Sequence, residues 1–148
     1  MSKALFVEST KVPMDRTLGL IHSLLSEHGA MAIMSEYENG QISQMAFRYK
    51  VGETFIAYRL PCRWRNILKL LKYKSYGPDD EARARRIAWR QVYWWLKAQL
   101  AMVDTEMVKL TEVFLPYAQY PTGETVYERL ETQRFQALTY QPNGAATP

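Results

Sequence analysis

The stretch that decides the fold is EYENGQISQMAFRY, residues 36–49. At its centre, Asn39-Gly40 is the strongest short signal for a two-residue turn between antiparallel strands, because that turn requires a positive φ at both positions. Polar and apolar residues alternate on either side of it. The stretch therefore predicts a β-hairpin with strands over residues 30–37 and 42–49.

A third strand is predicted directly after the hairpin. A turn at Gly52-Glu53 leads into residues 54–60, which alternate again, so the three strands form an antiparallel meander. One face of the middle strand carries Met45, Phe47 and Tyr49. Three half-apolar strands cannot bury themselves, so a helix has to cover one face of this sheet.

Residues at helical spacing flank the meander. Before it, residues 16–28 are predicted to form an amphipathic helix, with Asp15 as its N-cap and Gly29 as its left-handed C-cap. A short strand is predicted at residues 5–7. After the meander, a second helix is predicted from the apolar stripe Trp64, Ile67, Leu68 and Leu71, and its other side is basic.

The longest periodic stretch is residues 79–115, which contain neither Gly nor Pro. Apolar residues recur there in steps of three and four, and the acidic triplet at 79–81 suits a helix N-terminus. One continuous helix of about 55 Å is predicted. Its apolar seam either crosses the chain's own core, as such stripes usually do, or pairs in part with a second subunit in a homo-oligomer.

Together these segments predict an α+β fold with an N-terminal helix, a three-stranded antiparallel meander, a basic helix and one long C-terminal helix. A short helix over residues 125–135 follows. Residues 141–148 are small, polar and Pro/Gly-containing, which predicts a disordered tail. A chain of 148 residues fits a single domain, placed over residues 1–140.

Composition restricts the class of protein. Hydrophobic residues make up 47% and charged residues 23%, as in ordinary globular proteins, and no segment approaches 18 uninterrupted apolar residues. Cys62 is the single cysteine, so it has no internal disulfide partner. The first residues lack a secretory signal pattern. We therefore expect a cytoplasmic protein with no membrane partner.

Few residues are candidates for catalysis or metal binding. His22 and His28 lie six apart, on different faces of the first predicted helix, without a cysteine or histidine cluster beside them. Cys62 has no neighbouring histidine to act as a base, so a small buried thiol is expected, although an adjacent arginine could lower its pKa. Glu36 and Glu38 flank the turn, where carboxylates are usually solvated. No catalytic residue, no metal and no cofactor are predicted.

Positive charge is concentrated in the middle of the chain. The net charge of the whole chain is +4. Residues 1–60 are neutral overall, residues 61–97 carry ten basic and three acidic side chains, and residues 98–148 carry three basic and six acidic side chains. The middle segment is therefore net +7, which favours anionic partners.

The basic residues of this middle segment are interleaved with aromatic residues. Cations neutralise phosphates and release counterions, while aromatic rings stack on bases without reading their sequence. We therefore predict a nucleic-acid-binding surface formed by Arg63, Arg65, Lys69, Lys72, Tyr73, Lys74, Arg83, Arg86 and Arg90. The alternative is a solvated basic helix face that only keeps the protein soluble. Convergence of these residues in space distinguishes the two interpretations.

Several segments resemble a known family. Met107-Val108-Lys109, residues 112–117 and residues 125–130 resemble a family of small phage and prophage proteins, and residues 13–30 are similar too. This resemblance implies a phage context, among genes for replication and recombination, and it supplies no catalytic residues that could be carried over to this chain. The predicted order of elements also resembles the core of single-strand annealing proteins and the double-stranded-RNA-binding domain. It departs from the second, in which a short final helix has a basic start, because the helix here is very long and begins with acidic residues.

These observations lead to two function hypotheses. The first is a non-catalytic phage accessory protein that binds single-stranded or flexible nucleic acid in replication or recombination. The second is a protein-interaction module that inhibits a host enzyme or defence system, through the long helix or the open face of the meander. An enzyme would require distant polar groups to converge, for example Glu36, Glu38 and a histidine around one cleft.

Overall fold

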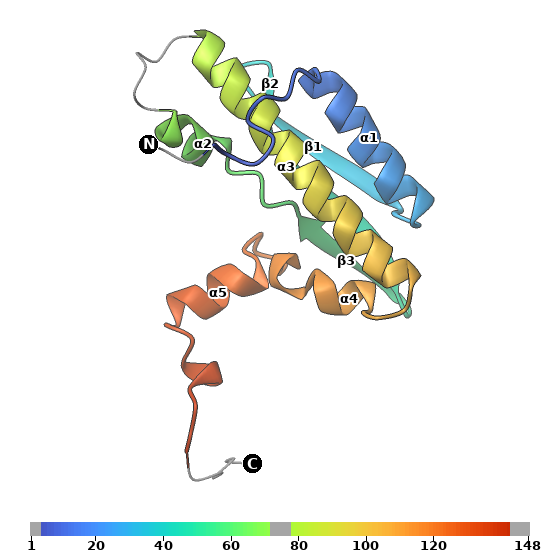
Figure 1. Cartoon of the computed structure of the whole chain (residues 1–148). Helices are drawn as coiled ribbons and strands as arrows, with labels where there is room; N and C mark the ends of the chain where they lie inside the picture. Colours follow the sequence, from blue (N-terminus) through green and yellow to red (C-terminus); the bar gives the residue numbers. More distant parts are fainter. Residues whose placement is uncertain (1–3, 72–77, 143–148) are drawn as a thin grey trace.

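The structure, a computed structural model, describes residues 4–71 and 78–142 of the chain. Strands β1 (Ala32–Glu38), β2 (Gln41–Val51) and β3 (Thr54–Arg59) form one antiparallel sheet in the order β1-β2-β3. Helices α1 (Met14–Glu27) and α3 (Pro78–Asp104) lie side by side over one face of this sheet (Figure 1). The predicted α+β fold and its three-stranded meander are confirmed.

The β1–β2 hairpin closes at Asn39 and Gly40, as predicted. Their φ values are +52° and +76°, the left-handed pair that a two-residue hairpin turn requires. A bulge follows in β2, since Glu36 pairs with Gln44 while Tyr37 pairs with Ile42. The extra residue places Ile42 and Met45, three positions apart, together in the core, where strict alternation would separate them.

The first helix begins two residues earlier than predicted, which corrects the assignment of its N-cap. Pro13 occupies the N-cap position of α1, and Asp15 lies within the first turn, where its carboxylate favours the helix dipole. The predicted left-handed residue Gly29 is confirmed, with φ +93°. The N–H of Ala30 donates to the carbonyl of Leu25 at 2.9 Å and closes the helix end.

Aromatic rings form the centre of the core. Phe47 in β2 packs against Tyr58 in β3 at 5.4 Å between ring centroids, and against Phe114 from the C-terminal part of the chain at 5.5 Å. Trp89, Leu96 and Leu100 of α3 belong to the same buried cluster. The apolar seam of α3 thus faces the chain's own core along this stretch.

The long helix is shorter than predicted, and the expectation of one helix over residues 79–115 is wrong. Helix α3 ends at Asp104, and Glu106 takes a left-handed φ of +61°. The N–H groups of Glu106 and Met107 donate to the carbonyls of Val103 and Met102, which is the usual closure of a helix end, here without glycine. The chain then turns back, so that α4 (Leu110–Val113) and the 3-10 helix η1 (Leu115–Tyr117) return to the sheet.

Residues 5–7 do not form the predicted short strand. They lead into a turn in which Val7 has a φ of +53°, and the segment crosses α3 on the side away from the sheet (Figure 1). Gln91 of α3 donates to the carbonyl of Phe6 at 3.0 Å. Side chains of the helix therefore hold this segment, which has no strand partner among the described residues.

The C-terminal part of the chain extends the sheet by isolated bridges. Ala118 pairs with Tyr58, and the N–H of Gln119 donates to the carbonyl of Ala57 at 2.8 Å. Helix α5 (Val126–Thr132) is shorter than the predicted residues 125–135 and begins with a capping box between Thr125 and Glu128. Beyond it, the 3-10 helix η2 (Gln136–Leu138) belongs to a segment that extends away from the body of the molecule (Figure 1). Of the predicted tail, residues 143–148 lie outside the described residues.

One ion pair joins the ends of α1 and α3. The two ring nitrogens of His28 lie 2.7 Å from the carbonyl of Leu24 and 3.0 Å from a carboxylate oxygen of Asp104. Both neighbours are acceptors, so the arrangement favours the doubly protonated ring. Burial lowers the pKa of His28, but the hydrogen bonds to Asp104 and Leu24 and the charges of Asp104 and Glu27 outweigh it, and the pKa is raised above 6.5.

This pair predicts that stability falls as the pH rises above about 6.5. A group whose pKa is higher in the folded state than in the unfolded state stabilises the fold fully at pH values below the unfolded-state pKa. This stabilisation is lost as the pH rises through the folded-state pKa. The contribution is at most about 1 kcal/mol, because Asp104 is exposed. Thermal unfolding from pH 5.5 to 8.5 should show this loss in the wild type and in His22→Asn, an exposed histidine on the same helix, but not in His28→Asn. Equal pH profiles for all three proteins would contradict it.

Within residues 4–71 and 78–142, no helix has both the length and the hydrophobicity needed to cross a bilayer.

Candidate nucleic-acid interface

The contact between α2 (Trp64–Leu70) and α3 positions the candidate site. The predicted apolar stripe of α2 is confirmed, because Trp64 and Leu71 are buried against Ala84 and Ala88 of α3. Small alanine side chains allow the two helices to approach closely. Trp64, only 6% exposed, is therefore fixed at the start of α2.

Two arginines stack on the Trp64 ring. The guanidinium carbon of Arg65 lies 4.6 Å from the ring centroid, and that of Arg85 lies 4.1 Å from it. Both distances are within the range of a cation–π contact, which is stronger for tryptophan than for the other aromatic residues. The ring thus brings together two cations that are twenty positions apart in the sequence.

A concave surface surrounds these side chains, and we name it the Trp64 groove. It is a cavity of about 370 Å³ between α2, the start of α3 and the β1–β2 turn, lined by Glu38, Asn39, Trp64, Arg65, Leu68, Lys69, Glu81 and Arg85. A second cavity of about 380 Å³ shares Glu81 and Arg85 with it and adds Arg86. Four cations and two carboxylates therefore line the two adjoining cavities.

The carboxylates offset part of this positive charge. Arg65 donates to both carboxylate oxygens of Glu38 at 3.3 Å. The two side chains are 59% and 55% exposed, so the pair is weak and a phosphate competes readily for the guanidinium. Glu81 precedes Arg85 by one helical turn, a spacing at which opposite charges attract.

Arg83 and Arg86 contact the N-terminal segment of the same chain. A guanidinium nitrogen of Arg83 lies 3.9 Å from the carboxylate of Glu8, and Nε of Arg86 donates to the carbonyl of Thr10 at 3.2 Å. These two predicted site residues therefore have a structural role in holding residues 4–13 over α3. Arg86 still lines the second cavity.

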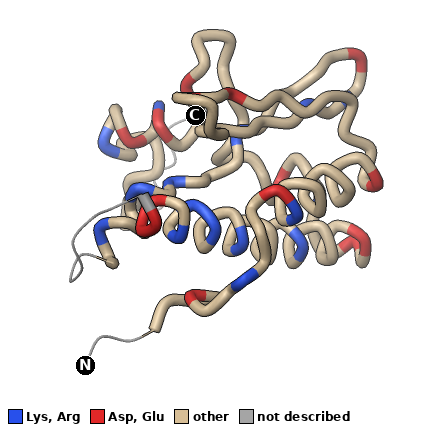
Figure 2. The backbone as a smooth tube through the Cα atoms, turned by 90° about the horizontal axis from the view of Figure 1, so that it is seen from above, with Lys and Arg blue, Asp and Glu red and all other residues tan. Residues whose placement is uncertain are grey.

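Arg90 lies further along α3, with aromatic neighbours. Its guanidinium carbon is 4.8 Å from the ring centroid of Tyr93 and 5.4 Å from that of Trp94. Lys97 approaches the same two rings at 5.8 and 5.2 Å. Figure 2 shows lysines and arginines recurring along the helix layer, with acidic residues interspersed. The cations of α3 thus follow the helix beyond the Trp64 groove.

The remaining predicted residues do not join this group in the described part of the chain. Arg63 lines separate cavities beside Pro61. Lys72, Tyr73 and Lys74 lie outside the described residues. Among the nine predicted site residues, the structure brings Arg65, Lys69 and Arg86 to the two adjoining cavities and places the others elsewhere or not at all.

Sequence reasoning missed the acidic side of the site. Glu38 belongs to the hairpin and reaches α2 only through the fold, and no local pattern signals that contact. Arg85 stands within the predicted basic segment, and its spacing from Glu81 was a usable signal. The chain thus places a hairpin carboxylate next to the predicted cations.

Cys62 and Glu38 are two further candidates for chemistry. Burial raises the pKa of the Cys62 thiol to about 12, as expected for a thiol that is not reactive, and the adjacent arginine does not lower it. Glu38 lines the Trp64 groove, but the residues around that groove include no histidine. Among residues 4–71 and 78–142, no three His, Cys, Asp or Glu side chains gather as a metal site would require.

Comparison of the chain with family models, with curated proteins and with solved structures finds no match.

Proposed function

We propose that this protein binds single-stranded or flexible nucleic acid without catalysing a reaction on it, as an accessory protein in replication or recombination. The Trp64 groove and its adjoining cavity contact the phosphate backbone. Arg65, Lys69 and Arg85 supply the main cations there, and Arg90 and Lys97 extend the path along α3.

The observation that carries this proposal is the stacking of Arg65 and Arg85 on one tryptophan ring inside a concave surface. Stacking restricts the side chains of both arginines, so less rotamer entropy is lost when they bind a phosphate. Their N–H groups form a planar fork that matches phosphate oxygens. Surface cations that move independently do not have this advantage.

Exposed aromatic side chains near the cations favour a strand with unpaired bases. Trp94 is 39% exposed beside Arg90 and Lys97. Bases stack on such rings only when they are not stacked within a duplex. The proposal therefore favours single strands over duplexes.

A second candidate function is a protein-interaction module. The segment after α5 presents Leu138 and Tyr140, which are 67% and 83% exposed, on the part of the chain that extends away from the body. These two exposed side chains are available to pack against another protein.

Fluorescence anisotropy with a labelled 20-nucleotide single strand tests the first proposal. At physiological salt we expect a dissociation constant of about 1 to 100 µM, the range of sequence-independent binding, and tighter binding at low salt. An abasic strand of equal length should bind more weakly because it retains phosphates and lacks stacking bases. No change in anisotropy at the highest protein concentration, or tighter binding to a duplex than to the single strand, would refute the proposal as stated.

A further inference from the structure

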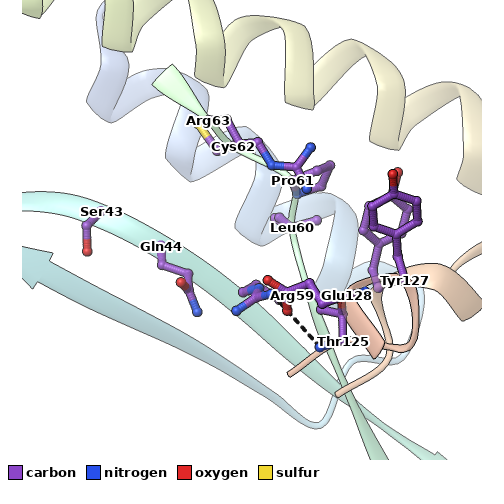
Figure 3. Close-up of a pocket in the computed structure, with 11 residues that line it drawn as sticks. Ser43, Gln44, Arg59, Leu60, Pro61, Cys62, Arg63, Thr125, Tyr127 and Glu128 are labelled. Atoms are coloured by element: carbon purple, nitrogen blue, oxygen red, sulfur yellow. Dashed lines mark hydrogen bonds and ion pairs between the residues drawn. The ribbon is translucent and has the colours of Figure 1, made fainter. Parts of the chain in front are cut away.

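A second groove follows the connection between β3 and α2, and we name it the Pro61 groove. Three cavities of about 180, 240 and 240 Å³ share Pro61 as a lining residue. On one side lies α3, and on the other lies the C-terminal part of the chain with η1 and α5 (Figures 1 and 3). Each cavity is below the roughly 300 Å³ at which pockets for whole small molecules begin, so one cavity accommodates only part of a nucleotide-sized ligand.

The walls of the Pro61 groove combine rings with primary amides. Trp95, Tyr117 and Tyr127 contribute the rings. Gln44 and Gln91 contribute amides, and Gln91 already donates to Phe6, which leaves its carbonyl oxygen as an acceptor. Amides pair with the edges of bases, and rings stack on their faces, so this set of groups suits an unpaired base.

One cation in the groove is available for a phosphate. Glu128 is paired with Arg59 and accepts the N–H of Thr125 at 2.8 Å, as Figure 3 shows. The pKa of Glu128 is lowered mainly by the hydrogen bond from the Thr125 N–H and also by Arg59. The carboxylate is therefore ionised at neutral pH, and Arg59 balances its charge. Arg63 makes no ion pair with any residue in 4–71 or 78–142. Its guanidinium therefore gives the groove a net positive charge.

An extended peptide is a poorer fit to this groove. Peptides commonly add to a sheet through the edge of a strand. Beside the groove, that edge of β3 is already taken, because Ala118 bridges Tyr58 and Gln119 donates to Ala57. The remaining groups are side chains whose chemistry matches a base and a phosphate.

We propose that the Pro61 groove binds one unpaired nucleotide, with the base against Tyr117 and Tyr127, its edge toward Gln44, and the phosphate on Arg63. Where that nucleotide belongs to a strand, the inference rests on the function proposed above. Where the nucleotide is a free nucleoside monophosphate, the inference is independent of that function.

Two titrations with the full-length protein test this inference. In the first, nucleoside 5′-monophosphates are added to ¹⁵N-labelled protein, and the side-chain signals of Trp95, Gln44 and Gln91 are followed by NMR. Saturable shifts are expected with nucleotides and not with inorganic phosphate alone. In the second, the 20-nucleotide strand is added, and the same signals should shift if the strand is a source of the nucleotide.

Variants at the rim of the Pro61 groove measure how much single contacts contribute to nucleotide affinity. Tyr127→Ala and Arg63→Gln should each weaken nucleotide affinity by about tenfold, since one stacked base or one phosphate contact is lost. Tyr127→Phe keeps the ring and should restore stacking. The matched control is Tyr37→Ala, because Tyr37 is a 67% exposed tyrosine that does not line the groove, and its removal should have no effect.

The outcomes separate the two proposals. Shifts with nucleotides and with the strand support the groove as a strand contact, and shifts with nucleotides alone support a site for free nucleotides. Unchanged signals with both ligands overturn the inference, even if the strand still binds through the Trp64 groove. Another result would also overturn the Pro61 groove as a strand contact. It is that variants of the Trp64 groove lose strand binding, whereas Arg63→Gln and Tyr127→Ala bind the strand as the wild type does.

Discussion

Replacing Phe114 with alanine should lower the free energy of unfolding by about 3 to 5 kcal/mol, the usual cost of removing a large buried ring. Phe114 is 1% exposed and lies after the end of α3, in the returning C-terminal part of the chain. Its ring contacts Phe47 in the sheet at 5.5 Å and Trp95 in α3 at 5.7 Å. The ring thus joins three parts of the core.

Urea unfolding followed by circular dichroism measures this loss. The matched control is Phe55→Ala, because Phe55 is 49% exposed on the sheet and should cost less than about 1 kcal/mol. Phe114→Leu retains most of the apolar volume and keeps the test valid if the alanine variant does not fold. Equal stability of Phe114→Ala and Phe55→Ala would show that residues 110–118 do not pack on the core as described.

The second large effect concerns nucleic acid. Replacing Arg65, Lys69 and Arg85 together with glutamine should weaken binding of the 20-nucleotide strand by roughly 100-fold, at about 1 kcal/mol for each lost phosphate contact. Glutamine keeps an aliphatic stem over Trp64, so the packing of α2 on α3 is largely retained.

The control for this variant carries the same change of net charge. Arg16, Lys50 and Lys109 are exposed cations outside the two cavities, and replacing all three with glutamine should weaken binding only slightly. Anisotropy titrations of both variants against the wild type give the comparison, and thermal unfolding verifies that both are folded. Equal losses in the two variants would mean that net charge, and not the Trp64 groove, determines binding.

The sheet was predictable because its signals are local. Asn39-Gly40 specifies the turn, and alternation specifies the faces of the strands on either side. The bulge in β2 was not predictable, because it depends on how Glu36 and Tyr37 pair across the hairpin. The packing of Ile42 beside Met45 is the result of that pairing.

The end of α3 was mispredicted for a physical reason. Periodic apolar residues continue through Phe114, but the chain reaches Phe114 by turning back at Glu106. The left-handed residue at a helix end is usually a glycine, which can be recognised in a sequence, whereas here it is a glutamate. The sequence therefore gave no sign that the periodicity spans two elements.

The site was predictable in its residue types and not in its geometry. The interleaved cations and rings of residues 63–90 indicated which chemistry to expect. Sequence alone did not show that Arg83 and Arg86 contact the N-terminal segment, or that Glu38 pairs with Arg65. Both facts depend on contacts between residues that are far apart in the chain.

The salt dependence of binding to a single strand tests the central claim most directly. If the Trp64 groove releases counterions from about three phosphates, it should contribute about −2 to the slope of the logarithm of the binding constant against the logarithm of salt concentration. In the variant with Arg65, Lys69 and Arg85 replaced, the slope should be shallower than in the wild type by about this amount, because only the cations outside the Trp64 groove still release counterions. The same slope in both proteins, or no binding by the wild type at the lowest salt, would contradict the account.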